Sequence, residues 1–176
     1  MKACALTIAV VAATGLAVGQ GRAQQQNAPS PRDVVPDKMP FDVPYGAPIP
    51  LDRAQAVAAA VIAECKKHDW KMNVSVVDSG GNLVAFARMD GAQLASIVVS
   101  ESKARAAAIY RRETKVFEDG VQAGNTYLLS LPGMISSRGG IPLVEDGKLI
   151  GAVGVSGGTG SQDEVCAKAG AALINK

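Results

Sequence analysis

Apolar residues recur every three or four positions between residues 51 and 65, which is the spacing of one face of an α-helix. Asp52 stands near the start of this stretch with Gln55 three residues later, so the pattern predicts a capped first turn with Asp52 as its N-cap. We therefore expect a helix over residues 51–67 that turns one face toward a core. The apolar positions are Leu51, Ala54, Val57, Ala58, Val61, Ile62 and Cys65.

Two pairs of short segments rich in β-branched residues are each joined by a turn that contains glycine. The first turn is Ser79–Asn82 and the second is Asp146-Gly147. Glycine supplies the positive φ that tight hairpin turns require, so each pair predicts an antiparallel hairpin. The four expected strands cover residues 73–78, 83–88, 141–145 and 148–155.

Helical patterns occupy most of the remaining chain. A helix is expected over residues 92–112, a short helical piece over 114–123, and a last helix that opens with a capping box of Ser161 and Glu164. The order helix, hairpin, helices, hairpin, helix predicts an α+β fold in which helices flank an antiparallel sheet. The apolar face of the last helix is formed by Val165, Ala169, Ala172 and Leu173.

The first 23 residues have the layout of a secretory signal peptide. Lys2 precedes a run of small apolar residues that ends at Val18, and polar residues follow up to Ala23, after which we expect cleavage. The run is shorter than the roughly 20 apolar residues that a membrane span needs. We therefore expect a periplasmic or secreted protein without a stable membrane span.

Residues 24–50 hold seven of the nine prolines and show no apolar periodicity. Each proline fixes its own φ and removes a backbone donor, so the segment predicts an extended, proline-rich arm ahead of one domain over residues 51–176. Two interpretations of the arm remain open: a spacer, or a segment whose apolar side chains lie across a neighbouring subunit. Those side chains are Phe41, Val43, Tyr45 and Ile49.

The charge of the expected mature chain argues against a nucleic-acid partner. Without Lys2 and Arg22, the 18 basic residues fall to 16, which balance the 16 acidic residues. No basic patch remains for a phosphate backbone.

The expected mature chain keeps two cysteines, Cys65 and Cys166, in a compartment where disulfides persist. Both lie in expected helices. If these helices pack side by side on the sheet, the two thiols form a disulfide; buried free thiols are the alternative.

Common catalytic and metal motifs are missing from the sequence. Gly154–Gly160 lacks the Lys-Ser/Thr ending of a P-loop and does not open a βαβ unit. One histidine and two separated cysteines do not provide zinc-ligand spacing, and no Gly-x-Ser-x-Gly elbow supports a serine nucleophile.

Several motifs carry a family resemblance and follow one another in order along the whole expected domain. They are Val76–Leu83, Arg88–Ala92, Ser102–Ala107, Gly139–Leu143, Ile150–Gly158 and Asp163–Gly170. Together they resemble the GlcG/HbpS-like haem-binding family. The resemblance implies a profilin-like α+β fold with an antiparallel sheet of about five strands flanked by helices. It also implies homo-oligomers, often octamers, with non-covalent haem binding in some members and haem degradation proposed for a few.

A haem site needs an apolar slot, cations or backbone donors for two propionates, and usually an axial ligand. The sequence has no Cys-x-x-Cys-His for covalent attachment, and its single histidine, His68, is a candidate ligand or alternatively a helix-capping residue. Arg88, Lys103 and Arg105 are candidate cofactor-binding cations, with surface pairs of Arg88 with Asp90 and of Lys103 with Glu101 as the alternative. Further ligand candidates are Tyr45, Tyr110, Tyr127, Met39, Met72, Met89 and Met134.

Three functions compete at this point, and the question of enzymatic activity stays open. The first is an exported protein that stores, carries or senses haem. The second is an accessory protein or enzyme for a small carboxylate metabolite, held by Arg88 and Lys103, with Asp78 or Asp163 moving a proton. The third is a structural homo-oligomer without a ligand. Homo-oligomerisation is a separate expectation, because the small residues of the helix at 97–110 allow another helix or sheet to approach it closely.

Overall fold

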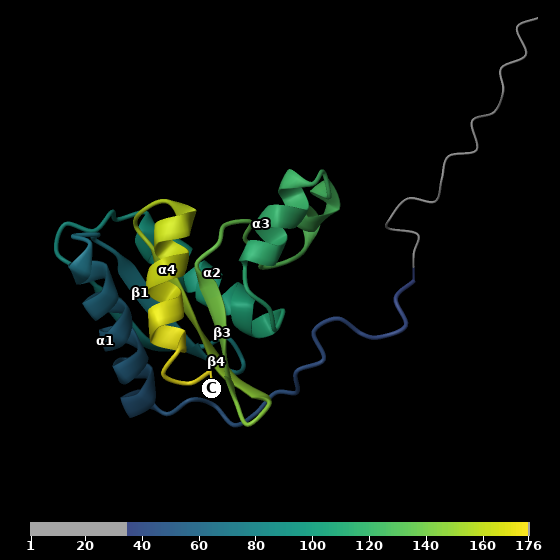
Figure 1. Cartoon of the computed structure of the whole chain (residues 1–176), viewed down its shortest axis with the longest axis horizontal. Helices are drawn as coiled ribbons and strands as arrows, with labels where there is room; N and C mark the ends of the chain where they lie inside the picture. Colours follow the sequence, from purple (N-terminus) through teal and green to yellow (C-terminus); the bar gives the residue numbers. More distant parts are fainter. Residues whose placement is uncertain (1–34, 176) are drawn as a thin grey trace, which may run out of the picture. The chain divides into compact units, whose positions relative to one another are not determined.

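The computed structural model describes residues 35–175. The expected signal peptide and the first part of the proline-rich arm lie outside the described residues. From Met39 onward the chain folds as one unit, in which helices cover both faces of a sheet (Figure 1). The predicted α+β class is confirmed.

The observed elements follow the predicted order. Both hairpins are confirmed, and the second helix is shorter than expected because turns precede it at residues 94–95 and follow it at residues 110–111. The elements are α1 (Leu51–Lys67), β1 (Asn73–Asp78), β2 (Leu83–Arg88), α2 (Ser96–Ile109), α3 (Lys115–Gln122), the 3-10 helix η2 (Thr126–Ser130), β3 (Gly140–Glu145), β4 (Lys148–Ser156) and α4 (Gly160–Ala171).

The strands form one antiparallel sheet in the order β2-β1-β4-β3. The sheet of the described chain therefore has four strands, and neither the expected count of about five nor the profilin-like label is confirmed. One extra bridge joins Tyr45 to Leu149 in parallel, but it does not extend into a fifth strand.

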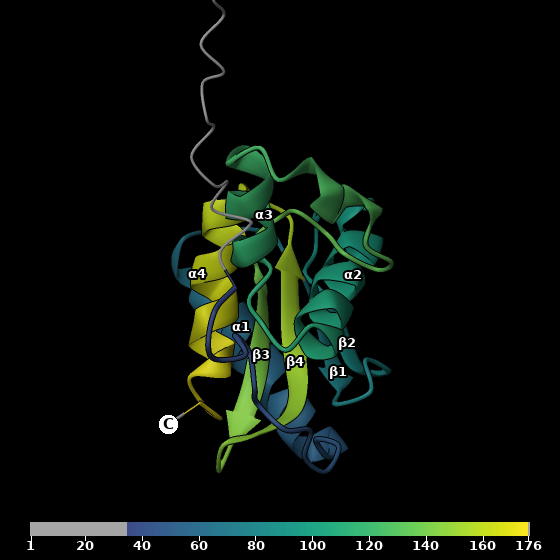
Figure 2. The same ribbon diagram turned by 90° about the vertical axis from the view of Figure 1, so that its right-hand side faces the viewer.

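Helices α1 and α4 pack on one face of the sheet and α2 packs on the other (Figure 2). Val74 and Val76 of β1 point toward α1 and α4, whereas Ser75 and Val77 point toward α2. This alternation follows from the period of two along a strand. The sheet consequently separates two layers of apolar packing.

The small residues of α2 pack inside the domain. Ala104, Ala107 and Ala108 are fully buried against β1 and β4, and a Cβ at Gly154 would lie 2.1 Å from the carbonyl oxygen of Ser100. The small residues of this helix predicted a close contact between subunits. That prediction is wrong for the buried face, because the alanines let the backbone of α2 approach its own sheet.

Two predicted helix caps differ from the structure. The capping box of α4 is formed by Thr159 and Gln162 rather than by Ser161 and Glu164, because the extended residue that precedes the helix is Thr159. Helix α1 begins at Leu51, one residue before the expected N-cap, so Asp52 lies in its first turn.

The last part of the arm packs on its own domain. The Tyr45 hydroxyl donates to the carbonyl oxygen of Ile109 at 2.9 Å, and Arg111 donates to the carbonyl oxygen of Val43 at 2.9 Å. Ile49 is buried in the core. A free spacer does not describe residues 43–49, because the end of α2 and β4 of the same chain provide their partners. The contact with a neighbouring subunit stays a prediction, since the Tyr45 side chain remains exposed.

Ion pairs connect α3 to α4 through Arg138. The guanidinium of Arg138 lies 2.7 Å from Glu118 of α3 and 3.5 Å from Glu164 of α4. The hydrogen bonds from Arg138 lower the pKa of Glu118 because they favour the ionised carboxylate.

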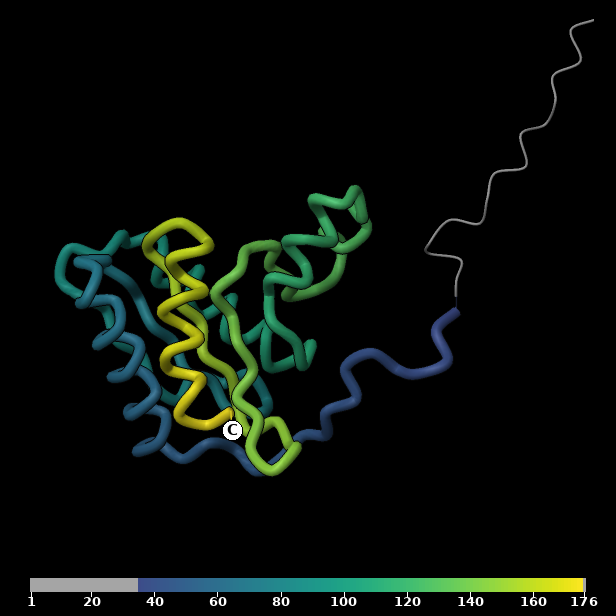
Figure 3. The backbone as a smooth tube through the Cα atoms, viewed as in Figure 1, coloured from purple at the N-terminus to yellow at the C-terminus, as the bar shows by residue number. Residues whose placement is uncertain are grey.

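A disulfide joins α1 to α4. Cys65 and Cys166 are fully buried and their Cα atoms are 5.7 Å apart. The two helices lie side by side, as the backbone trace shows (Figure 3). The same pairing was predicted for the case in which the two helices pack side by side on the sheet.

Removing the disulfide is expected to lower the free energy of unfolding. The bond joins residues separated by 101 positions, and closing a long loop restricts the unfolded chain. For Cys65→Ala/Cys166→Ala we expect a loss of about 2–4 kcal/mol in urea titrations followed by circular dichroism. Wild-type protein reduced by a phosphine is the control, since it retains both sulfur atoms. Equal stability of the oxidised and reduced wild type would contradict the prediction.

Candidate functional site

Three connecting segments of the chain lie next to one another at one end of the sheet. Asn73, the first residue of β1, lies opposite Arg88 of β2 and opposite Ser156 of β4. The segment that enters β1, the segment that leaves β2 and the segment that links β4 to α4 are therefore neighbours. We call this region the corner site and define it by the residues that line its two pockets.

The two pockets of the corner site adjoin each other. Their volumes are about 420 and 350 Å³, and Asp69 and Lys71 line both. The larger pocket is also lined by Ile62, Lys66, Arg88, Met89 and Asp90. The smaller is also lined by Trp70, Met72, Gly91, Gln93, Gly157, Gly158 and Gln162.

Cations outnumber carboxylates around the larger pocket. Among the described residues, Lys66 and Arg88 have no ion-pair partner, and Lys71 has only a 3.4 Å contact with Asp69. The surface pair of Arg88 with Asp90, considered as an alternative, is not formed in the described chain. Lys66 and Arg88 are consequently available to an anionic ligand.

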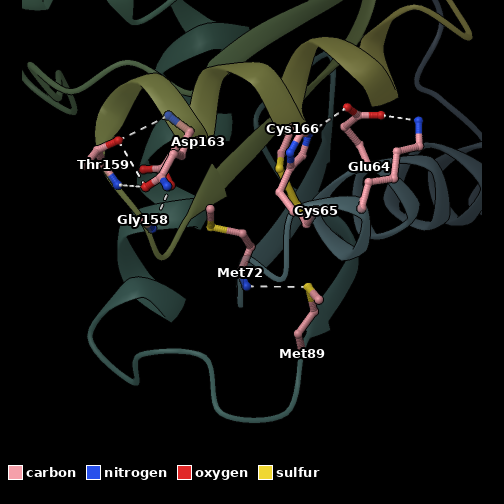
Figure 4. The surroundings of a disulfide bond; sticks show 11 residues. Glu64, Cys65, Met72, Met89, Gly158, Thr159, Asp163 and Cys166 are labelled. Carbon is pink, nitrogen blue, oxygen red and sulfur yellow. Dashed lines mark hydrogen bonds and ion pairs between the residues drawn. A yellow bond between two sulfur atoms is a disulfide. The ribbon is translucent and has the colours of Figure 1, made fainter.

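One tryptophan and two methionine side chains line the pockets together with these cations. Trp70 and Met89 are partly buried and pack against the main core, while Met72 is fully buried. The backbone N–H of Met72 donates to the sulfur of Met89 at 3.5 Å, which places the two methionines side by side (Figure 4). The corner site thus combines an apolar wall with a cationic rim.

His68 lies beside the corner site and lines neither pocket. Its backbone N–H donates to the carbonyl oxygen of Cys65 at 3.1 Å, so it caps the C-terminus of α1. Its ring stacks on Trp70 with centroids 4.3 Å apart, and Nε2 lies 3.3 Å from Glu64. Hydrogen bonds from Lys67 and then from His68 lower the pKa of Glu64. The capping alternative is observed, and iron ligation stays a prediction.

Lys103 is buried beneath the segment that links β4 to α4 and is not exposed beside Arg88. Its ammonium lies 2.7 Å from Asp163, the two side chains are 1% and 3% exposed, and it also donates to the carbonyl oxygen of Val155 at 3.1 Å. The other Asp163 oxygen accepts the N–H of Gly158 at 3.0 Å (Figure 4). Burial raises the pKa of Asp163 even though Lys103 opposes that shift. The surface pair of Lys103 with Glu101, considered as an alternative, is not formed among the described residues.

Arg105 lies in a separate place. It is exposed and lines a pocket of about 300 Å³ between α2 and β2, together with Glu101, Ser102 and Leu83. The four cofactor candidates therefore do not converge. His68 and Arg88 lie at the corner end of the sheet, Lys103 is buried in an ion pair, and Arg105 faces another pocket.

Sequence reasoning missed Lys66, Lys71, Trp70 and Asn73. Lys66 and Lys71 lie on either side of Trp70 in the sequence, and this local cluster of basic and aromatic residues could have indicated the site.

The Asn73 amide nitrogen donates to the carbonyl oxygen of Gln93 at 2.9 Å, while its buried Oδ1 has no partner among the described residues. Nothing in the sequence pattern pointed to that unsatisfied acceptor.

The described residues contain no group of three or more His, Cys, Asp or Glu residues suited to a metal ion. No helix in that part of the chain is both long enough and apolar enough to cross a membrane.

Comparison with known proteins gives the family. Residues 49–172 match the model of the HbpS-like family, described as haem degrading protein HbpS-like, and this match covers more than half of the chain. The protein therefore belongs to the HbpS-like family, as its motifs indicated.

Individual relatives agree with that assignment. Protein GlcG of Escherichia coli strain K12 is 46% identical over 107 residues, which are 58% of this chain and 80% of GlcG. A double mutant of Streptomyces reticuli HbpS superposes with a TM-score of 0.68 at 27% identity, over 81% of this chain and 98% of that one. A PduOC:heme complex superposes with a TM-score of 0.66 at 28% identity, over 73% and 96% of the two chains.

The buried ion pair predicts a large effect of one substitution. Lys103→Met leaves the Asp163 carboxylate buried without its cation, so we expect a loss of about 3–5 kcal/mol in the free energy of unfolding. Adding Asp163→Asn removes the uncompensated charge and is expected to restore part of that loss. Urea titrations measure both changes. Arg105→Met, which removes an exposed cation from the same helix, is the control; an equal effect of both single substitutions would contradict the prediction.

Proposed function

We propose that this protein binds haem non-covalently at the corner site. The observation that carries the proposal is the pair of adjoining pockets at the corner site. Lys66 and Arg88, which have no ion-pair partner among the described residues, lie there beside the apolar side chains of Trp70 and Met89. A porphyrin combines a flat apolar macrocycle with two carboxylates, and this arrangement offers a partner to each part. The haem complex of the related PduOC supports the same chemistry.

The residues take separate roles in this proposal. Lys66 and Arg88 hold the propionates, and the apolar wall contacts the macrocycle. His68 is the proposed axial ligand because it is the single imidazole of the chain and sits against Trp70 at the edge of the site. The signal-like N-terminus supports export, which gives a protein that stores, carries or senses haem outside the cytoplasm.

A hemin titration followed by absorbance tests this function. We expect a saturable Soret band at about one haem per chain, or per interface between chains. Lys66→Ala/Arg88→Ala is expected to weaken binding about tenfold or more, since both propionate partners are lost. His68→Ala is expected to shift the position of the Soret band because it removes the proposed iron ligand.

Lys148→Ala/Arg105→Ala is the matched control, because it removes two exposed cations outside the corner site. This control is expected to bind hemin like the wild type. Non-saturating, featureless absorbance would refute haem binding. Equal weakening by both double substitutions would refute the corner site as its location.

We also propose that the protein forms homo-oligomers in which a second copy covers β2. The outer edge of β3 is occupied within the chain, because Asn175 pairs with Pro142 and Val144. Strand β2 forms the other edge, and Phe86 and Leu83 remain 39% and 51% exposed on it. Exposed edge strands with apolar side chains favour association.

The side chains that carry this interface lie on one face. Phe86 lies opposite Ser75 and Leu83 lies opposite Val77, and both partners point toward α2. Directly opposed residues share a face of the sheet, so Phe86 and Leu83 lie beside α2, which leaves β2 uncovered there. Leu94, just before α2, and Val98, within α2, add exposed apolar surface.

Light scattering coupled to gel filtration tests the oligomer. We expect the wild type to exceed the mass of one chain and Phe86→Asp to reduce that mass, because a carboxylate is costly to bury at an interface. Val165→Asp is the control, since Val165 is similarly exposed on α4. A monomeric wild type would refute the oligomer, and an unchanged mass for Phe86→Asp would refute the β2 interface.

A further inference from the structure

A fourth pocket lies apart from the corner site and from the pocket at Arg105, and it is built partly from residues outside the family match. Its volume is about 360 Å³, at the lower end of the range of roughly 300–1,000 Å³ typical of small-molecule sites. Phe41 and Asn175, which line it, fall outside residues 49–172. The other lining residues are Arg112, Glu113, Lys115, Val116, Asp119, Pro142 and Val144.

Phe41 is held over this pocket in an unfavourable backbone conformation. Its φ is +72°, in the left-handed region, which costs a bulky residue about 1–3 kcal/mol. The guanidinium carbon of Arg112 lies 3.5 Å from the centre of the Phe41 ring and 5.5 Å from that of Phe117. Cation–π contact therefore helps to keep Phe41 in place.

Arg112 presents an uncompensated positive charge. Its Nε donates to the carbonyl oxygen of Tyr110 at 3.0 Å, and it has no carboxylate partner among the described residues. The neighbouring Arg111 also lacks one there and donates to the backbone of Val43 instead. Burial, followed by repulsion from Arg111, lowers the pKa of Arg112. Two adjacent guanidinium groups without a carboxylate partner favour the binding of an anionic ligand next to them.

The two carboxylates of the pocket already have cationic partners. Asp119 pairs with Lys115 within α3 and lies 3.6 Å from Arg138. Glu113 lies 3.9 Å from Lys168. The charge that remains uncompensated at the pocket therefore belongs to Arg112.

We propose that this pocket binds a small organic carboxylate with an apolar body. The carboxylate pairs with the guanidinium of Arg112, whose Nη atoms have no acceptor among the described residues. The apolar body packs against Phe41, Val116 and Val144. The site is independent of the proposed haem site, because the two share no lining residue.

Isothermal titration calorimetry with benzoate and hexanoate tests the proposal, with benzamide as the uncharged counterpart of benzoate. We expect saturable binding of at least one acid at about one site per chain, and much weaker binding of benzamide. Arg112→Gln is expected to weaken binding about tenfold or more, because the charged partner is removed. Phe41→Ala is expected to weaken it several-fold through lost apolar contact. Arg105→Gln, which removes an exposed cation at another pocket, is the control and is expected to bind like the wild type.

Val116→Glu keeps Arg112 in place and adds a carboxylate on the partly exposed wall of the pocket, so it is also expected to abolish acid binding. Circular dichroism verifies that each variant is folded, and Val116→Glu replaces Arg112→Gln in the test if the latter unfolds. Failure of both acids to saturate, equal binding of benzamide, or full affinity in a folded Arg112→Gln or Val116→Glu variant overturns the proposal. Hemin binding by Arg112→Gln should be unchanged, which separates this test from that of the corner site.

Discussion

The ion pair between Lys103 and Asp163 is the interaction on which the arrangement of this domain depends. Lys103 belongs to α2 and Asp163 to α4, so one contact joins helices from opposite faces of the sheet at the end of β4. The pair also binds the carbonyl of Val155 and the N–H of Gly158. Isolated buried charges are costly, whereas a pair with its remaining groups hydrogen-bonded is tolerated. The last strand, the turn after it and both helices are therefore positioned together.

Close backbone approach surrounds this pair and gives its glycines a specific role. A Cβ at Gly139 would lie 2.8 Å from that of Asp163, and Gly139 adopts a φ of +114°. The contact of α2 with β4 similarly depends on Gly154. Both glycines lie within residues 49–172, which match the HbpS-like family, and their role in this chain is to permit close packing beside the buried charge and between α2 and β4.

The two proposed ligand sites use different parts of the chain. The corner site is built from residues within the family match, where three turns meet at the end of the sheet. The pocket at Arg112 requires Phe41 from the arm and Asn175 from the C-terminal end. Asn175 has a second role, since its amide occupies the edge of β3. The flanking segments thus contribute both a closed sheet edge and a separate pocket to the shared fold.

Local sequence patterns predicted the helices, the two hairpins and their order, because apolar periodicity and glycine turns are local properties that need no distant partner. They also placed Arg88 at the end of a strand and paired Cys65 with Cys166 once adjacent helices were assumed. The strand order, the packing of Phe41 on Arg112 and the burial of Lys103 emerged from the three-dimensional fold alone. Lys103 meets Asp163 across 60 positions of the chain. Spacing along the sequence does not encode such a contact, because it arises only when both helices dock on the same sheet.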